Sequence, residues 1–202
     1  MDAQEWDDRY RAQDRLFSGN PNGVLVTEAS ALEPGRALDV GCGEGGDALW
    51  LADRGWRVTA VDIAPTALRR GAALDPDGRV TWTEADLSTS RPAAGAFDLV
   101  SVQYFPLRRE AGDAALRGLL DAVAPGGLLL YVGHDVSEVP ADSGFRPEDY
   151  YHPADVAEQL GPQWTILADG TRPRTAPAPP GTHHRHDTVL LARFTPASAT
   201  TS

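Results

Sequence analysis

Short apolar runs alternate with helical patterns along the chain, and the clearest run leads into a cluster of glycines. Ala37, Leu38 and Val40 form a run that is typical of a strand buried on both faces. A glycine-rich turn over 41–46 follows it. Apolar residues at helical spacing then begin after Asp47 and stop at 54–55. A strand, a glycine turn and a helix in this order predict the nucleoside-binding unit of an α/β fold.

The rest of the chain repeats this alternation. Six further strands are expected over 57–63, 79–87, 96–102, 128–132, 164–167 and 187–194. Helices are expected from 64 onwards, over 108–123 and over 153–160. The segment between the last two strands has no room for a helix, so these strands should be antiparallel neighbours. The pattern predicts an α/β fold with a doubly wound, mostly parallel seven-stranded sheet and an antiparallel last strand.

The chain divides into three parts around this sheet. Residues 1–34 are expected to form an N-terminal lid segment and a helix, with Asn20 as N-cap and Pro21 at the first helical position. Trp6 and Tyr10 in this segment could cover a cofactor or could simply pack on the domain. Residues 35–195 form the main domain, and residues 196–202 form a small, polar tail that should fray.

Composition excludes several classes of protein. The 202 residues carry a formal charge of −11, and such a surface repels nucleic acid and anionic membranes, so neither is expected as a partner. No stretch approaches the ~20 apolar residues of a membrane span, and no signal peptide is visible, so we expect a cytoplasmic protein. All 18 basic residues are arginines. A P-loop, a Schiff-base enzyme and a short-chain reductase each need a lysine and are excluded.

The glycine turn alone leaves two cofactors open. Gly41, Gly43 and Gly46 match the dinucleotide pattern G-x-G-x-x-G, and the run from Asp39 through Gly41 and Gly43 to residue 45 also matches acidic-x-G-x-G-x-G. Asp62 lies 21 positions after Gly41, near the ~20 expected of an acid that holds ribose hydroxyls. It could also serve as a helix N-cap, because the next helix begins directly after it.

Several motifs occurring in order resemble those of class I S-adenosylmethionine-dependent methyltransferases. They are Asp39-x-Gly41-x-Gly43, Asp62, Asp86-Leu87, the 125–127 turn before the fifth strand and the final hairpin. The resemblance implies S-adenosyl-L-methionine as cofactor, with the acid at Asp86 accepting from the adenine amino group and Leu87 contacting the ring. As a lone acid, Asp86 could equally form a turn. The expected cofactor-binding residues are Trp6, Asp39, Gly41, Cys42, Gly43, Asp62, Ile63, Asp86, Leu87 and Gln103.

A second resemblance concerns the methyl acceptor, which should be a small molecule. The region of Trp6 and 19–22, with the His/Arg-rich segment before the last strand, looks like the small tellurite-resistance and thiopurine methyltransferase-like group. That likeness implies methyl transfer to sulfur, selenium or tellurium. Because ligands bind at the carboxyl ends of parallel strands, residues around 134 and 172–186 should lie near the cofactor. We hypothesise His134 or His184 as the base and Arg174 or Arg185 as a clamp for an anionic acceptor.

Two other classes of protein share some of these features. An NAD-dependent oxidoreductase would share the glycine turn and Asp62, and a non-catalytic cofactor-binding protein could keep the fold alone. His184 and His186 could share one strand face, but no cysteine or paired carboxylate accompanies them, so no metal is expected. Cys42 is expected to be a packed residue rather than a nucleophile. The sequence does not indicate an oligomeric state.

Overall fold

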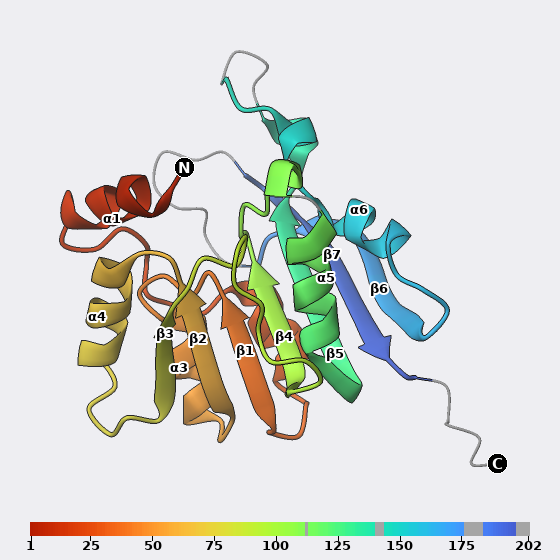
Figure 1. Cartoon of the computed structure of the whole chain (residues 1–202), viewed down its shortest axis with the longest axis horizontal. Helices are drawn as coiled ribbons and strands as arrows, with labels where there is room; N and C mark the ends of the chain where they lie inside the picture. The colour runs from red at the N-terminus through yellow and green to blue at the C-terminus, as the bar shows by residue number, and fades with distance from the viewer. Residues whose placement is uncertain (112, 140–143, 176–183, 197–202) are drawn as a thin grey trace.

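A seven-stranded sheet forms the centre of the protein in the computed structural model, which describes residues 1–111, 113–139, 144–175 and 184–196 (Figure 1). The strand order is β3-β2-β1-β4-β5-β7-β6. Strands β1 to β5 are parallel to one another, whereas β7 is antiparallel to both β5 and β6. The strands are β1 Arg36–Val40, β2 Arg57–Asp62, β3 Val80–Glu84, β4 Phe97–Gln103, β5 Val123–His134, β6 Trp164–Pro173 and β7 His186–Phe194. The predicted fold class and the antiparallel last strand are confirmed.

Helices cover both faces of the sheet, as the apolar strands require. On one face, apolar side chains of α2, α3 and α4 pack against residues such as Ala37 and Ala60. On the other face, α5 and α6 pack against residues such as Leu38 and Val100. Figure 1 shows α3 behind β1 and β2, with α5 in front of β4 and β5. The helices are α1 Ala3–Arg11, α2 Gly23–Ala29, α3 Gly46–Asp53, α4 Pro65–Ala73, α5 Asp113–Ala122 and α6 Pro153–Glu158, with 3-10 turns η1 Arg109–Ala111, η2 Val136–Glu138 and η3 Pro147–Asp149.

Several element boundaries differ from the prediction. The helix expected over 108–123 begins as a 3-10 turn and becomes α-helical only at Asp113. Strand β5 begins at Val123, because this residue already pairs with Phe97 of β4. The register then shifts, and this shift accommodates the glycine turn at 125–127. Strand β6 continues to Pro173, since its ladder with β7 extends that far. The helix at 153 ends at Glu158.

The predicted start of α2 is wrong. The helix begins at Gly23 with Asn22 as N-cap, rather than with Asn20 and Pro21. Asn22 is held in place by Asp47 of α3, whose carboxylate accepts its backbone N–H at 2.6 Å and its side-chain amide at 2.8 Å. This contact joins residues 25 positions apart, so local helix signals did not indicate it.

The N-terminal segment contains a helix that sequence analysis missed. In α1, Asp2 and Glu5 form a capping box, and Tyr10 on the inner face is buried. The carboxylate of Asp7, also in α1, accepts the backbone N–H of Thr66 at 2.7 Å, so α1 caps the first turn of α4. The helix is mostly polar, and its aromatic residues pack in a small cluster with Ala64 and Ala67. The apolar stripe was therefore too narrow to predict it.

Candidate active site

The glycine turn after β1 lies at the edge of the sheet where the parallel strands end. Gly41 and Gly43 have positive φ angles of 68° and 53°, which side chains other than glycine rarely adopt. The N–H groups of Gly41 and Cys42 donate to the carbonyl of Val61 at 2.8 and 3.0 Å. A Cβ at Gly41 would lie 2.6 Å from the ring of Phe105. The turn is thus tied to β2, and its glycines let neighbouring side chains pack directly against its backbone.

Asp62 links this turn to helix α4. One of its carboxylate oxygens accepts the N–H of Gly43 at 2.8 Å, and the other accepts the N–H of Ala64 at 2.9 Å. Each oxygen keeps a second lone pair, so the predicted contact with ribose hydroxyls is compatible with these bonds. The alternative role of Asp62 as helix N-cap is wrong. Ala64 occupies that position, and Asp7 supplies the capping carboxylate.

Two buried acceptor atoms under the turn lack partners among the described residues. They are the Oδ2 atom of Asp39 and the Oε1 atom of Gln103. Both side chains lie on the same sheet face, because Asp39 pairs with Ser101 and Gln103 follows two residues later. Burial raises the pKa of Asp39 well above its usual range, and the charges of Asp47 and Asp62 add to this. A buried acceptor without a donor is costly, so this pair fits a ligand that brings N–H groups, such as an ammonium.

The N-terminal segment is fastened beside the turn by a residue that sequence analysis did not single out. Buried Glu44 accepts the N–H groups of Leu16 and Phe17 at 3.1 and 3.4 Å and pairs with Arg70 at 3.0 Å. Trp6 is half-buried, with its ring centroid 6.4 Å from that of Tyr10. An isolated glutamate in a glycine turn carries no motif signal, and only its long-range partners show its role.

The remaining predicted cofactor residues surround the same edge. Asp86 is half-buried, and its Oδ1 atom accepts from the N–H and hydroxyl of Ser88 at 2.8 and 2.6 Å. Asp86 therefore forms a turn, which was the alternative role predicted for it. Its second carboxylate oxygen stays available for an adenine contact. Leu87 is buried and Ile63 is half-buried. Cys42 is buried, and burial raises the pKa of its thiol, which disfavours a thiolate nucleophile.

A stack of three rings lies at the ends of β4, β5 and β7. The ring of His134 stacks on Tyr104 with centroids 4.4 Å apart and on His184 with centroids 3.9 Å apart. Tyr104 has a φ angle of 54°, a conformation that non-glycine residues adopt rarely and often at functional sites. The sequence placed His134 and His184 at this same edge, but it did not single out Tyr104, which directly follows the predicted Gln103.

Arg174 joins this stack to a buried carboxylate. Its Nη1 atom donates to Asp187 at 2.7 Å and lies 3.4 Å from Nδ1 of His134. Its guanidinium carbon is 5.1 Å from the centroid of the Tyr104 ring, in cation–π geometry. The Arg174 and Asp187 side chains are only 8% and 3% exposed, so this is a buried ion pair. The sequence placed Arg174 near the edge but did not identify Asp187 as its partner.

The other residues of the His/Arg-rich segment have different positions. The side chain of Arg185 is 83% exposed, and its Nε atom lies 3.6 Å from Oε1 of Glu138. The backbone N–H of His186 donates to Oε2 of the same Glu138, and the Nδ1 atom of His186 lies 2.7 Å from Oε1 of that carboxylate. These contacts lower the pKa of Glu138 to about 2. His183, which was expected near the cofactor, lies outside the described residues.

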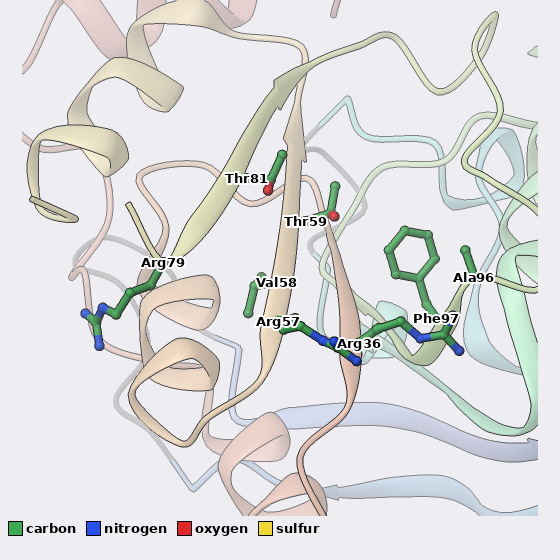
Figure 2. A pocket seen from close by; sticks show the side chains of 8 residues that line it. All are labelled: Arg36, Arg57, Val58, Thr59, Arg79, Thr81, Ala96 and Phe97. Carbon is green, nitrogen blue, oxygen red and sulfur yellow. The ribbon is translucent and has the colours of Figure 1, made fainter. Parts of the chain in front are cut away.

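A pocket of about 450 Å³ lies at the opposite edge of the sheet (Figure 2). No helix forms over 85–96 between β3 and β4, which leaves the amino ends of β1 to β3 open on one face. Two of its arginines are already neutralised, Arg36 by Asp98 at 3.1 Å and Arg79 by Asp53 at 2.6 Å. Figure 2 shows the Arg79 side chain pointing away from that of Arg36. This pocket contains none of the predicted site residues and is not the candidate active site.

Comparison with known proteins supports the same site. Residues 37–127 match the sequence model of the family described as a methyltransferase domain. A 2-heptyl-1-hydroxyquinolin-4(1H)-one methyltransferase of Mycobacteroides abscessus is 30% identical over 140 residues, covering 65% of this chain and 60% of that protein. The chain spans between 48% and 60% of the length of this and two other curated relatives that it matches.

Two solved structures show the same fold. NodS of Bradyrhizobium japonicum, an N-methyltransferase in complex with S-adenosylhomocysteine, superposes with a TM-score of 0.72 at 19% identity, over 96% of this chain and 99% of that one. TehB of Haemophilus influenzae gives a TM-score of 0.70 at 18% identity, over 94% of this chain and 66% of that one.

The chain therefore has the Rossmann-like fold of class I methyltransferases, and its residues 37–127 match a methyltransferase domain. The predicted resemblance to this class is confirmed, and the cofactor of the class is S-adenosyl-L-methionine. Among the described residues, no helix is long and apolar enough to cross a membrane.

Proposed function

We propose that this protein transfers the methyl group of S-adenosyl-L-methionine to a small-molecule acceptor held against the ring stack. One observation carries the proposal: the glycine turn, with its unpartnered buried acceptors, and the ring stack with its buried arginine occupy the same edge of one sheet. This is the edge at which open α/β sheets bind their ligands. When bound, the cofactor supplies an electrophilic methyl group on a sulfonium.

The cofactor would be held by residues of the glycine turn and the neighbouring strand ends. Asp39 and Gln103 would accept from its ammonium group, and Asp62 would accept from its ribose hydroxyls. The glycine turn would allow close approach of the backbone, and Asp86 would meet the adenine amino group. The full proposed set is Trp6, Asp39, Gly41, Cys42, Gly43, Asp62, Ile63, Asp86, Leu87 and Gln103.

On the acceptor side, the main task of the protein is positioning. Proximity and orientation can supply ~7–11 kcal/mol of the barrier reduction. Arg174 is the stronger candidate to hold an anionic acceptor, because it is buried beside His134, whereas Arg185 is exposed and faces Glu138. His134 and His184 are the candidates for contact with the reacting atom, since their rings are stacked in the same cluster.

For the acceptor we propose a soft nucleophile, a thiol or a selenium or tellurium species. The likeness of the Trp6 region and the His/Arg-rich segment to the tellurite-resistance and thiopurine group supports this choice. A hydroxyl on a planar heteroaromatic ring is the second candidate. The stack of three rings favours it, because a flat acceptor can extend such a stack. The name of the Mycobacteroides abscessus relative points to the same kind of acceptor.

An acceptor screen with labelled methyl donor tests the proposal. The panel contains small thiols, selenite, tellurite, phenols and a 1-hydroxyquinolin-4-one, with headspace detection of volatile products. We expect turnover with at least one of them, and we expect Arg174→Gln to reduce it while Arg193→Gln, an exposed change at the far end of β7, does not. Folding of both variants is checked by circular dichroism.

Calorimetric titration distinguishes the alternatives. S-adenosylhomocysteine should bind and NAD should not. Binding of NAD in its place would overturn the proposal in favour of an oxidoreductase. Binding of S-adenosylhomocysteine without turnover of any acceptor would indicate a non-catalytic domain.

A further inference from the structure

We infer that His134 acts as a fixed hydrogen-bond donor rather than as a general base, and that the acceptor reacts as an anion that is already ionised when it binds beside Arg174. This inference rests on the proposed function and narrows the substrate to a class. The class is thiols, selenols and acidic hydroxyls, as opposed to aliphatic alcohols and amines. The hydrogen bonds of Arg174 support this assignment.

Arg174 fixes the tautomer of His134. A guanidinium carries only donors, so a ring nitrogen that hydrogen-bonds to it must present a lone pair. The Nη1 atom of Arg174 lies 3.4 Å from Nδ1 of His134 and donates to Asp187 at 2.7 Å. Asp187 is the ladder partner of His134 across β5 and β7, so the sheet itself holds the three groups in register. The single proton of the neutral ring is therefore on Nε2.

The surroundings also keep the ring neutral. Burial is the main cause that lowers the pKa of His134, to about 3, and the neighbouring His184 and Arg174 lower it further. The charge of Glu138 acts in the opposite direction and raises the pKa of His134. The titratable and charged groups that face His134 from β4, β6, β7 and η2 are Tyr104, Arg174, His184, Asp187 and Glu138. A ring with this pKa is a poor proton acceptor at neutral pH.

Arg174 has a donor left over for a ligand. Its side chain is 8% exposed, and its Nε atom is buried without a hydrogen-bond partner among the described residues. Buried donors are almost always satisfied, so this one fits an acceptor group that the described residues do not supply, such as one on a bound ligand. An anionic oxygen or sulfur would form a charge-assisted bond here, which is stronger than a bond to a neutral group.

An ionised acceptor needs no base. Its lone pair forms the new bond to the methyl carbon, and the bond from that carbon to the sulfonium sulfur breaks with its electron pair passing to sulfur. The anion becomes a neutral methylated product and the sulfonium becomes a neutral thioether. No proton moves in this step, so the Nε2–H of His134 is free to orient the acceptor throughout.

The tautomer can be measured without any substrate. A long-range ¹H–¹⁵N correlation spectrum of the protein, with His134 assigned through the loss of its signals in His134→Asn, reports which nitrogen carries the proton. We expect the Nε2–H form, unchanged between pH 5 and 8. An Nδ1–H form, or a titration of His134 within that range, would overturn the inference.

Kinetics test the acceptor class. We expect the midpoint of the kcat/KM profile against pH to follow the acceptor, and to lie lower for a thiophenol with an electron-withdrawing substituent than for thiophenol itself. We expect His134→Ala to lose roughly ten- to hundred-fold in kcat/KM, the range for a hydrogen bond to a charged group, and His134→Asn, which keeps an N–H donor, to recover part of that loss.

Failure of the inference differs from failure of the proposed function. One midpoint shared by all acceptors and abolished in His134→Asn or His184→Asn would show an imidazole base and overturn the inference while methyl transfer stands. Absence of turnover with every acceptor, although S-adenosylhomocysteine binds, would overturn both.

Discussion

Replacing Gly43 by alanine tests the geometry of the proposed cofactor turn. Gly43 has a φ angle of 53°, and a left-handed conformation costs a non-glycine residue about 1–2 kcal/mol. The added Cβ would also lie 2.8 Å from the hydroxyl of Tyr10, which is only 3% exposed and cannot move freely. Crowding a packed site of this kind costs about 1–3 kcal/mol. We expect the free energy of unfolding of Gly43→Ala to fall by the sum of both effects.

Gly78→Ala is the matched control. Gly78 has a similar φ angle of 63°, but nothing lies within 4 Å of its added Cβ. Its loss of stability should therefore be limited to the backbone contribution of about 1–2 kcal/mol. The double variant Gly43→Ala/Tyr10→Phe removes the crowded hydroxyl and should recover part of the difference between the two alanine variants.

Urea unfolding and calorimetric titration with S-adenosylhomocysteine measure the two consequences separately. We expect Gly43→Ala to weaken binding at least tenfold, about 1.4 kcal/mol, because its methyl group occupies the turn that the cofactor must approach. Gly78→Ala should bind as the wild type does. Equal affinities of the two variants, both folded, would refute the assignment of this turn to the cofactor.

Three further predictions concern the N-terminal segment and the ring stack. Asp7→Ala removes the carboxylate that accepts the N–H of Thr66 and should lower the free energy of unfolding by about 0.5–2 kcal/mol in urea titrations, whereas the exposed neighbour Asp8 should tolerate alanine. Glu44→Gln breaks the ion pair with Arg70 and should speed proteolysis within residues 1–17; cleavage at the wild-type rate would show that this pair does not hold the segment. The pKa of His134 is lowered to about 3 in the folded protein. Below pH ~6.5 the imidazole is therefore protonated in the unfolded chain but stays neutral in the folded chain. Stability present at neutral pH should thus be lost as pH falls, by up to about 1.4 kcal/mol per unit, in urea unfolding of the wild type relative to His134→Asn. Parallel losses in both proteins between pH 7 and 5 would contradict this assignment.

The fold could be predicted because its determinants are local. Each strand of the parallel sheet is a short apolar run such as 37–40, and each turn carries its own glycine or proline. The antiparallel last strand followed from the length of the connection alone. Helix α1 was missed because its apolar face is narrow and its stability depends on contacts with α4 that lie far along the chain.

For the candidate site, the sequence by itself determined which residues reach the carboxyl edge of the sheet, among them His134, Arg174 and Asp62. It could not determine how they interact there. Antiparallel pairing of β5 and β7 sets Asp187 opposite His134, and Arg174 then bridges the two. The register of two strands more than 50 residues apart decides these contacts, and with them the charge and tautomer of the imidazole. Hydrogen bonding and burial depend on that three-dimensional arrangement, so only the tertiary structure could show that a histidine expected as a base is placed as a donor.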